Sequence, residues 1–146
     1  MKILDPEFNR VVLEMSKQVQ YYVSDHEYES FDDMKTSFEK YGYLLINRDN
    51  SENTIFGVPY INHAFRAWHD YCHILGGYDF SLSGELVTSQ MQCAQMADRF
   101  PDHPKLGWWN SILDCEVFGQ ASYFLDHNEF PSNQYEFALG YLGLEG

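Results

Sequence analysis

Several residue types and patterns are scarce in this sequence, and each scarcity excludes a class of protein. The 146 residues include only three cysteines, which lie far apart and form no C-x-x-C pair, so neither a disulfide framework nor a thiolate zinc site is expected. Nine basic residues stand against 22 acidic ones, and the net charge of −13 argues against direct binding to nucleic acid or to an anionic membrane surface. No glycine-rich phosphate loop, nucleophile elbow or dinucleotide fingerprint is present.

Long apolar runs are also absent. No stretch approaches the roughly 20 apolar residues that span a bilayer, and the first ten residues lack an apolar signal segment. We therefore expect a cytoplasmic protein that does not enter a membrane. The acidity fits a solvated surface, a cation-binding site, or a protein that imitates DNA and occupies a basic protein partner.

Aromatic residues are abundant, at 17% of the chain, and supply large side chains for a core. A chain of this length buries about 68–70% of its unfolded surface, which favours a single domain over residues 1–146. The spacing of apolar residues predicts an all-α fold, a bundle of about four main helices with short extra helices. The main helices are expected over 6–25, from 59 to the Gly76-Gly77 pair, over 84–100 and over 108–125, with shorter ones over 31–41 and 131–142. Residues 43–46 fit either a short strand or coil.

The stretch from His63 to His73 places three imidazoles, a carboxylate and a guanidinium within three helical turns. At about 100° per residue, four of its polar side chains fall within an arc of roughly 80°, and the fifth follows about 40° further on. The four are His63, Arg66, Asp70 and His73, and the fifth is His69. This helix face is rich in metal ligands and proton carriers. The Asp70-x-x-His73 spacing parallels the Glu-x-x-His units of metal sites in helical bundles.

Two further helices carry polar side chains that we expect to meet this face. On the helix over 108–125, Glu116 and Gln120 lie on a stripe of large apolar residues, and a carboxylate facing a core is costly unless it is paired or bound to metal. On the helix over 84–100, Glu85 is the one carboxylate of a polar stripe that also contains Thr88, Ser89 and Gln92. If the three helices meet, their oxygen and nitrogen atoms form a pocket.

Three blocks of these residues resemble a family of phage-borne proteins, which occur alone or within large polyvalent phage proteins. The blocks are F-R-A-x-H-D with a following histidine, here Phe65 to His73, then G-E at Gly84-Glu85, then E-x-x-G-Q at Glu116 to Gln120. The resemblance spans about two fifths of the chain and implies a shared site without implying a reaction. It also implies that the cytoplasm is that of a bacterial or phage-infected cell. Trp68 departs from the small aliphatic residue expected at its position, and Tyr71-Cys72 replaces an aromatic residue followed by glycine.

Two other classes share part of the pattern. The His69-Asp70 dipeptide is similar to that of HD-domain phosphohydrolases, but the distant histidine and aspartate of that ligand set are not clearly placed here. Ferritin-like carboxylate proteins use two Glu-x-x-His units, whereas this chain offers one Asp-x-x-His and a Glu116-x-x-x-Gln120 pair. One metal is therefore expected more readily than two.

The leading prediction is a metal-dependent hydrolase that acts on a small or phosphorylated substrate. Its divalent cation, Mn, Fe or Zn, would be held among His69, Asp70, His73, Glu85, Glu116 and Gln120. His69 and Glu116 would also move protons, and Arg66 would neutralise an anionic group. The same ligands would serve a protein that binds metal without catalysis. The alternatives are a non-enzymatic acidic phage accessory protein that binds a basic partner, and a ferritin-like, oxygen-activating iron protein.

Overall fold

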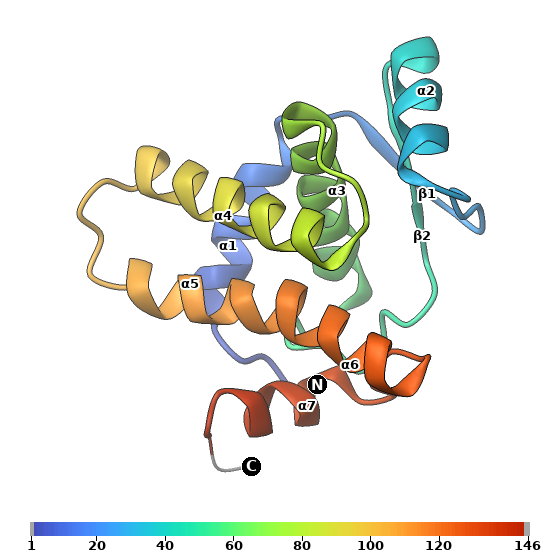
Figure 1. Ribbon diagram of the computed structural model, residues 1–146. Coiled ribbons are helices and arrows are strands. Elements are labelled where there is room, and N and C mark those ends of the chain that lie inside the picture. The colour runs from blue at the N-terminus through green and yellow to red at the C-terminus, as the bar shows by residue number, and fades with distance from the viewer. Residues whose placement is uncertain (1, 145–146) are drawn as a thin grey trace.

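The computed structural model describes residues 2–144 and confirms a mostly helical fold (Figure 1). In chain order the elements are α1 (Pro6–Ser16), β1 (Tyr21–Ser24), α2 (Phe31–Tyr41), β2 (Leu44–Asn47), α3 (Pro59–Gly76), α4 (Leu82–Arg99), α5 (Leu106–Asp114), the π-helical turn η1 (Cys115–Gly119), α6 (Gln120–His127) and α7 (Gln134–Tyr141). Within the described range, no helix combines the length and apolar character needed to cross a membrane.

Local capping signals determine where several helices begin and end. The Asp5 side chain accepts hydrogen bonds from the first backbone N–H groups of α1. Ser30 caps α2 in the same way, and Gly42 ends that helix in the left-handed conformation, with φ of 79°. Gly77 ends α3 with φ of 69°. The predicted bounds of α2 and α3 are therefore confirmed, because both depend on residues adjacent in sequence.

The prediction of one helix over residues 6–25 is wrong in its second half. The helix α1 ends at Ser16, and residues 21–24 form β1, which pairs in parallel with β2 so that Tyr21 lies opposite Leu44. Val19 and Tyr22 continue the helical spacing in the sequence, but Val19 packs with Leu44 in a separate apolar cluster and Tyr22 is exposed. Pairing with a distant strand overrides the local pattern. The open question over residues 43–46 is answered by a short strand, β2.

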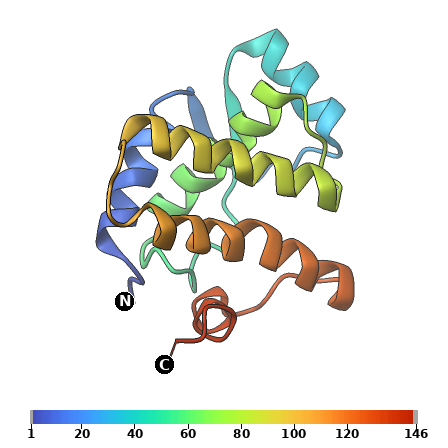
Figure 2. The same cartoon turned by 60° about the vertical axis from the view of Figure 1, so that its left-hand side comes forward.

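The helix predicted over 108–125 is present as three consecutive segments, α5, η1 and α6, that continue one another. The π-helical turn η1 inserts extra backbone at Glu116, in the middle of the predicted helix. Such turns are rare and occur often at functional sites. Figure 2 shows this long helix lying beside α4.

The helix α3 lies between two apolar clusters and thus forms the centre of the molecule. On one side Phe65, Trp68 and Cys72 pack in the main core with residues of α1, α4 and α5. On the other side Ala67 packs in a smaller cluster with Met34 of α2 and residues of the two strands. Because both sides are packed, the direction of the remaining face of α3 is fixed.

Candidate metal centre

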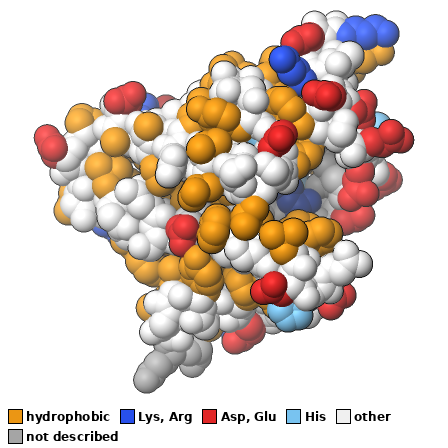
Figure 3. All heavy atoms as spheres, viewed as in Figure 1, with side chains coloured by type: hydrophobic (Ala, Val, Ile, Leu, Met, Phe, Trp, Pro, Cys, Tyr) orange, Lys and Arg blue, Asp and Glu red, His pale blue; other side chains and the backbone are white. Residues whose placement is uncertain are grey.

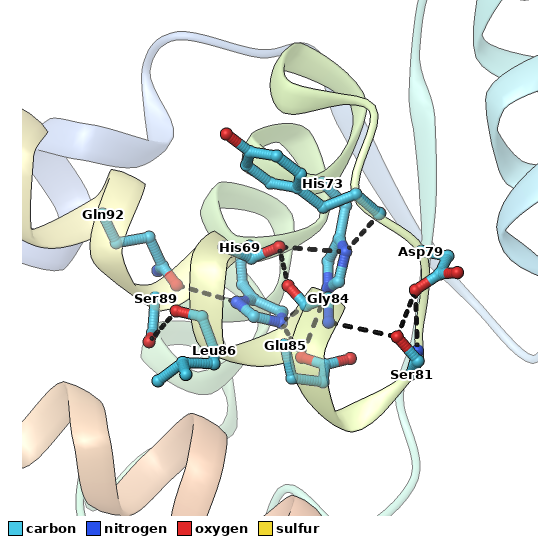
Figure 4. Close-up of polar contacts among 11 residues, drawn as sticks. His69, His73, Asp79, Ser81, Gly84, Glu85, Leu86, Ser89 and Gln92 are labelled. Atoms are coloured by element: carbon cyan, nitrogen blue, oxygen red, sulfur yellow. Dashed lines mark hydrogen bonds and ion pairs between the residues drawn. The ribbon is translucent and has the colours of Figure 1, made fainter.

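Three ligand atoms converge where α3 meets the first turn of α4. The Nε2 atom of His69 lies 2.8 Å from Oε2 of Glu85 and 3.0 Å from Nε2 of His73. The same Glu85 oxygen lies 3.3 Å from Nε2 of His73. Figure 4 shows both imidazoles and this carboxylate directed toward one another. Among the described residues, His69, His73 and Glu85 form a group whose ligand atoms all lie within 4.8 Å of one another.

Helix geometry and one glycine place these side chains together. His69 and His73 are four residues apart and therefore lie on the same face of α3, one turn above the other. Glu85 reaches them because α4 begins close to the end of α3, with Ser81 as its cap. At Gly84 an added Cβ atom would overlap the backbone carbonyl oxygen of Asp79, so the approach of the connecting loop requires glycine there.

The second ring nitrogen of His73 is fixed as a hydrogen-bond donor. Its Nδ1 atom lies 2.8 Å from the carbonyl oxygen of Tyr78, which can only accept. It also lies 3.2 Å from Oγ1 of Thr88, whose hydroxyl proton is donated to the carbonyl of Gly84. The Nδ1 proton is thus held by two oxygens, and Nε2 is the ring nitrogen that faces Glu85.

The second ring nitrogen of His69 has a side-chain partner instead. Its Nδ1 atom lies 2.7 Å from Oε1 of Gln92 on α4. The Phe65 ring stacks almost parallel to the imidazole, with centroids 6.3 Å apart, and restricts its rotation. With Nδ1 donating, Nε2 of His69 faces Glu85 with a lone pair when the ring is neutral and with an N–H group when the ring is protonated. Histidines that bind metals use their other ring nitrogen in this way.

The charges of the three groups are coupled. Burial opposes ionisation of Glu85, but its hydrogen bonds to His69 and His73 lower its pKa to about 2. Burial by itself would lower the pKa of His69, yet the bond and the charge of Glu85 raise it above the ordinary value. Two nitrogen lone pairs and a carboxylate oxygen so close together repel one another unless a positive charge lies between them. That charge is a proton or a metal cation.

Beside the three ligands lies a cavity of about 340 Å³. Its wall includes His69 and Glu85, together with Arg66, Asp70 and several uncharged amides from the β2–α3 loop, α6 and α7. Burial raises the pKa of Asp70, and the charge of Glu85 adds to this increase. Figure 3 shows a hollow with basic atoms inside it and acidic side chains along its edge.

Glu116 lies in the wall of the same cavity, on η1, and is 8% exposed. Burial raises the pKa of its carboxyl to about 8, partly offset by a hydrogen bond that Gln120 donates to Oε2 at 3.1 Å. The group is therefore mainly protonated at neutral pH. The Nε2 atom of Gln120 also donates a hydrogen bond to Oε1 of Gln134, at 3.5 Å. This bond links α6 to α7.

The structure separates the predicted site residues into two sets. His69, His73 and Glu85 come together, which confirms the coarser expectation of a group able to hold a metal ion. Asp70, Glu116 and Gln120 line the neighbouring cavity outside that group. Arg66 also lines it, and its guanidinium donates to the carbonyls of Asn47 and Asn50. Their roles as ligands or catalytic groups stay predictions.

Sequence reasoning did not assign a role at the site to three groups that hold the imidazoles. Gln92 and Thr88 were noted only as members of a polar stripe on α4, and the carbonyl of Tyr78 has no side-chain signature at all. A buried polar stripe facing a histidine helix is the signal that points to the first two. The backbone acceptor requires the three-dimensional path of the α3–α4 loop.

Comparison with known proteins adds no relative: no family model matches the chain, and no significant match was found among curated proteins or solved structures.

Proposed function

We propose that this protein is a metal-dependent hydrolase that binds one divalent cation through His69, His73 and Glu85. The observation that carries the proposal is the orientation of the two imidazoles: both Nδ1 atoms face oxygen acceptors, and both Nε2 atoms face one carboxylate oxygen. Two imidazoles and a carboxylate suit Mn, Fe or Zn better than Ca or Mg alone. We further propose that the substrate is small or phosphorylated and occupies the adjoining cavity.

The residues that line the cavity would transfer protons and bind the substrate. A bound cation of this kind lowers the pKa of a water molecule and polarises an oxygen of the substrate. Asp70, which lines the cavity with His69 and Glu85, would accept a proton, and the carboxyl of Glu116 would donate one. Gln120 engages one carboxyl oxygen of Glu116 and leaves the other available. Arg66 supplies the positive charge that an anionic substrate group requires.

Metal titration tests the first part of the proposal. Chelator-treated protein is titrated with Mn²⁺, Fe²⁺ or Zn²⁺, and we expect one ion per chain, bound less tightly as the pH falls because protons compete for the imidazoles. His69→Ala and Glu85→Gln should abolish binding. Glu136→Gln is the matched control for the second variant, since Glu136 stands in the first turn of another helix, α7. Equal binding by wild type and both site variants would refute the site.

Hydrolysis is tested separately with the loaded protein. Small phosphomonoesters, phosphodiesters and carboxylic esters are offered in turn, and turnover should disappear in Arg66→Gln for the phosphorylated substrates alone. Glu116→Gln should reduce turnover while metal binding persists, because Glu116 lies outside the ligand group. If the protein binds metal but hydrolyses none of these substrate classes, the hydrolase proposal fails and metal binding alone stands.

The ligand set favours one second candidate, an oxygen-activating iron protein. Two histidines and one carboxylate with open positions are the ligand pattern of non-haem iron oxygenases. The experiment that separates the two candidates is oxygen uptake by the Fe²⁺-loaded protein. Uptake that requires Glu85 would favour the iron protein, whereas turnover of esters with Zn²⁺, which has no redox chemistry, would favour the hydrolase.

A further inference from the structure

The two histidines of the metal centre differ in the group that determines which ring nitrogen carries the proton. For His73, the nearest acceptor of the Nδ1 proton is the backbone carbonyl of Tyr78, and a carbonyl cannot become a donor. For His69, the partner is the carboxamide of Gln92, which carries an acceptor and a donor on the same carbon. Rotation of that amide by a half-turn exchanges the two. The tautomer of His69 therefore depends on Gln92.

Only one orientation of the Gln92 amide leaves His69 able to bind a cation. With Oε1 toward the ring, Nδ1 carries the proton and the lone pair of Nε2 points to Glu85, as the structure has it. With the amide nitrogen toward the ring, Nδ1 must accept, and the proton moves to Nε2. That proton would then point at Oε2 of Glu85 and occupy the place of the cation.

The observed orientation leaves a buried donor unsatisfied. Gln92 is completely buried, and its Nε2 atom has no hydrogen-bond partner within residues 2–144. Unpaired buried N–H groups are rare in folded proteins because their desolvation is not compensated. The rotated orientation would give this nitrogen the Nδ1 atom as an acceptor. Hydrogen bonding at Gln92 alone therefore does not explain the observed orientation. A proton on Nδ1 of His69 does, and the cation-binding tautomer carries its proton there, as does the protonated ring.

We propose that Gln92 is a positioning residue that selects the metal-binding tautomer of His69. This inference rests on the metal binding proposed above. It assigns to Gln92 the function that the backbone carbonyl performs for His73. A carboxylate at position 92 accepts in every orientation, so it should hold the metal-binding tautomer permanently.

Zn²⁺ titration of three variants tests the proposal. Gln92→Leu keeps the size of the side chain but removes the acceptor, and should weaken Zn²⁺ binding about 10- to 100-fold. Gln92→Glu should bind at least as tightly as the wild type. Gln95→Leu is the control, because Gln95 also accepts a bond from α3, at 2.8 Å from Trp68 Nε1, without touching an imidazole. It should leave Zn²⁺ affinity unchanged.

The tautomer itself is measured by imidazole ¹⁵N chemical shifts of metal-free protein at alkaline pH. We expect the His73 ring to stay protonated on Nδ1 in all variants. For His69, Gln92→Glu should fix the proton on Nδ1, and Gln92→Leu should move it to Nε2, beside Glu85. Equal Zn²⁺ affinity of Gln92→Leu and wild type, or equal losses in Gln92→Leu and Gln92→Glu, would overturn the proposal.

The two proposals fail in different ways. A wild-type protein that takes up no Zn²⁺ disproves the metal site, whereas the ¹⁵N measurement still reports whether Gln92 controls His69. A wild-type protein that binds Zn²⁺ while all three variants bind it equally well disproves the role of Gln92 and leaves the site intact. Gln92→Glu keeps the test decisive if Gln92→Leu does not fold.

Discussion

The position of single protons decides what the side chains of this site can do. Glu85 is ionised throughout the neutral range, since its pKa is about 2, whereas Glu116 in the same cavity is mainly protonated. Two carboxyl groups thus have opposite states within one cavity, because two imidazoles contact the first and burial opposes ionisation of the second. Divergent acidity of this kind is what a site needs to hold a charge at one place and to donate a proton at another.

Glu116 should make the stability of the protein depend on pH. Its folded-state pKa of about 8 exceeds the ordinary value of 4.5, so the folded chain retains a proton that the unfolded chain loses. The free energy of unfolding should therefore fall as pH rises from about 4.5 to 8, by on the order of 3–5 kcal/mol, and level off above. Glu116→Gln should remove this part of the decrease, while the raised pKa values of Asp70 and His69 keep their own contributions. Urea unfolding of chelator-treated protein over that range measures it.

Asp114→Asn is a useful comparison for that measurement, because Asp114 lies two residues before Glu116 but is exposed, and it accepts a hydrogen bond from Tyr141. It should keep the wild-type pH dependence. An unfolding free energy for wild type that is level between weakly acidic and weakly alkaline pH would show that Glu116 ionises normally in the folded protein.

A residue could be assigned to the site from the sequence only where its partners lie close to it in the sequence or on the same helix. His69, His73 and Glu85 could be grouped because a four-residue spacing and a helix start are visible locally. Gln92 could not, since its contact with His69 depends on how α4 packs against α3. Burial of Glu116 could be anticipated from its apolar neighbours on the helix, but its bond with Gln120 across the π-helical turn could not.

Among the elements, α4 owes its position to a glycine in its first turn. Gly84→Ala would place a methyl group against the carbonyl of Asp79 and push the α3–α4 loop outward. We expect a loss of about 1–3 kcal/mol in the free energy of unfolding, as for other overpacked sites, and weaker metal binding because Glu85 moves away from His73. Chemical denaturation and Zn²⁺ titration measure the two effects.

Gly107→Ala is the corresponding control on α5, where an added Cβ atom meets nothing within 4 Å. It should leave metal binding unchanged and should stabilise the helix by roughly 0.5–1 kcal/mol, because alanine favours helix more than glycine does. If Gly84→Ala were as stable as Gly107→Ala, the close approach of the loop would not constrain α4.

The elements also show which parts of the fold the sequence could determine. The bounds of α2 follow from Ser30 and Gly42, which cap it directly. The strand β1 was missed because its hydrogen bonds go to β2, which follows α2 in the sequence. Nothing within residues 17–25 indicates that partner. The π-helical turn was missed because residues 115–119 lie within one continuous helical segment, and no cap or proline there indicates a change of helix type.

For the whole molecule, cation binding should appear as thermal stabilisation. An ion that binds only the folded chain adds about 2.7 kcal/mol at a hundredfold excess over its dissociation constant, and for a chain of this size we expect the melting temperature to rise by roughly 5–10 °C. Glu85→Gln should abolish the rise with Mn²⁺, Fe²⁺ or Zn²⁺. Differential scanning calorimetry with and without each ion measures it, and an equal rise in Glu85→Gln would place the ion elsewhere.

The three proposed ligands all lie between residues 69 and 85, on two helices joined by a short loop. Contacts between residues near in sequence form early in folding, because little chain entropy is lost in closing the loop between them. The ligand group should therefore assemble with the α3–α4 hairpin, before α5 to α7 dock on it. A cation would then act on the folding transition state: it should accelerate refolding and leave the unfolding rate nearly unchanged, which stopped-flow kinetics can resolve.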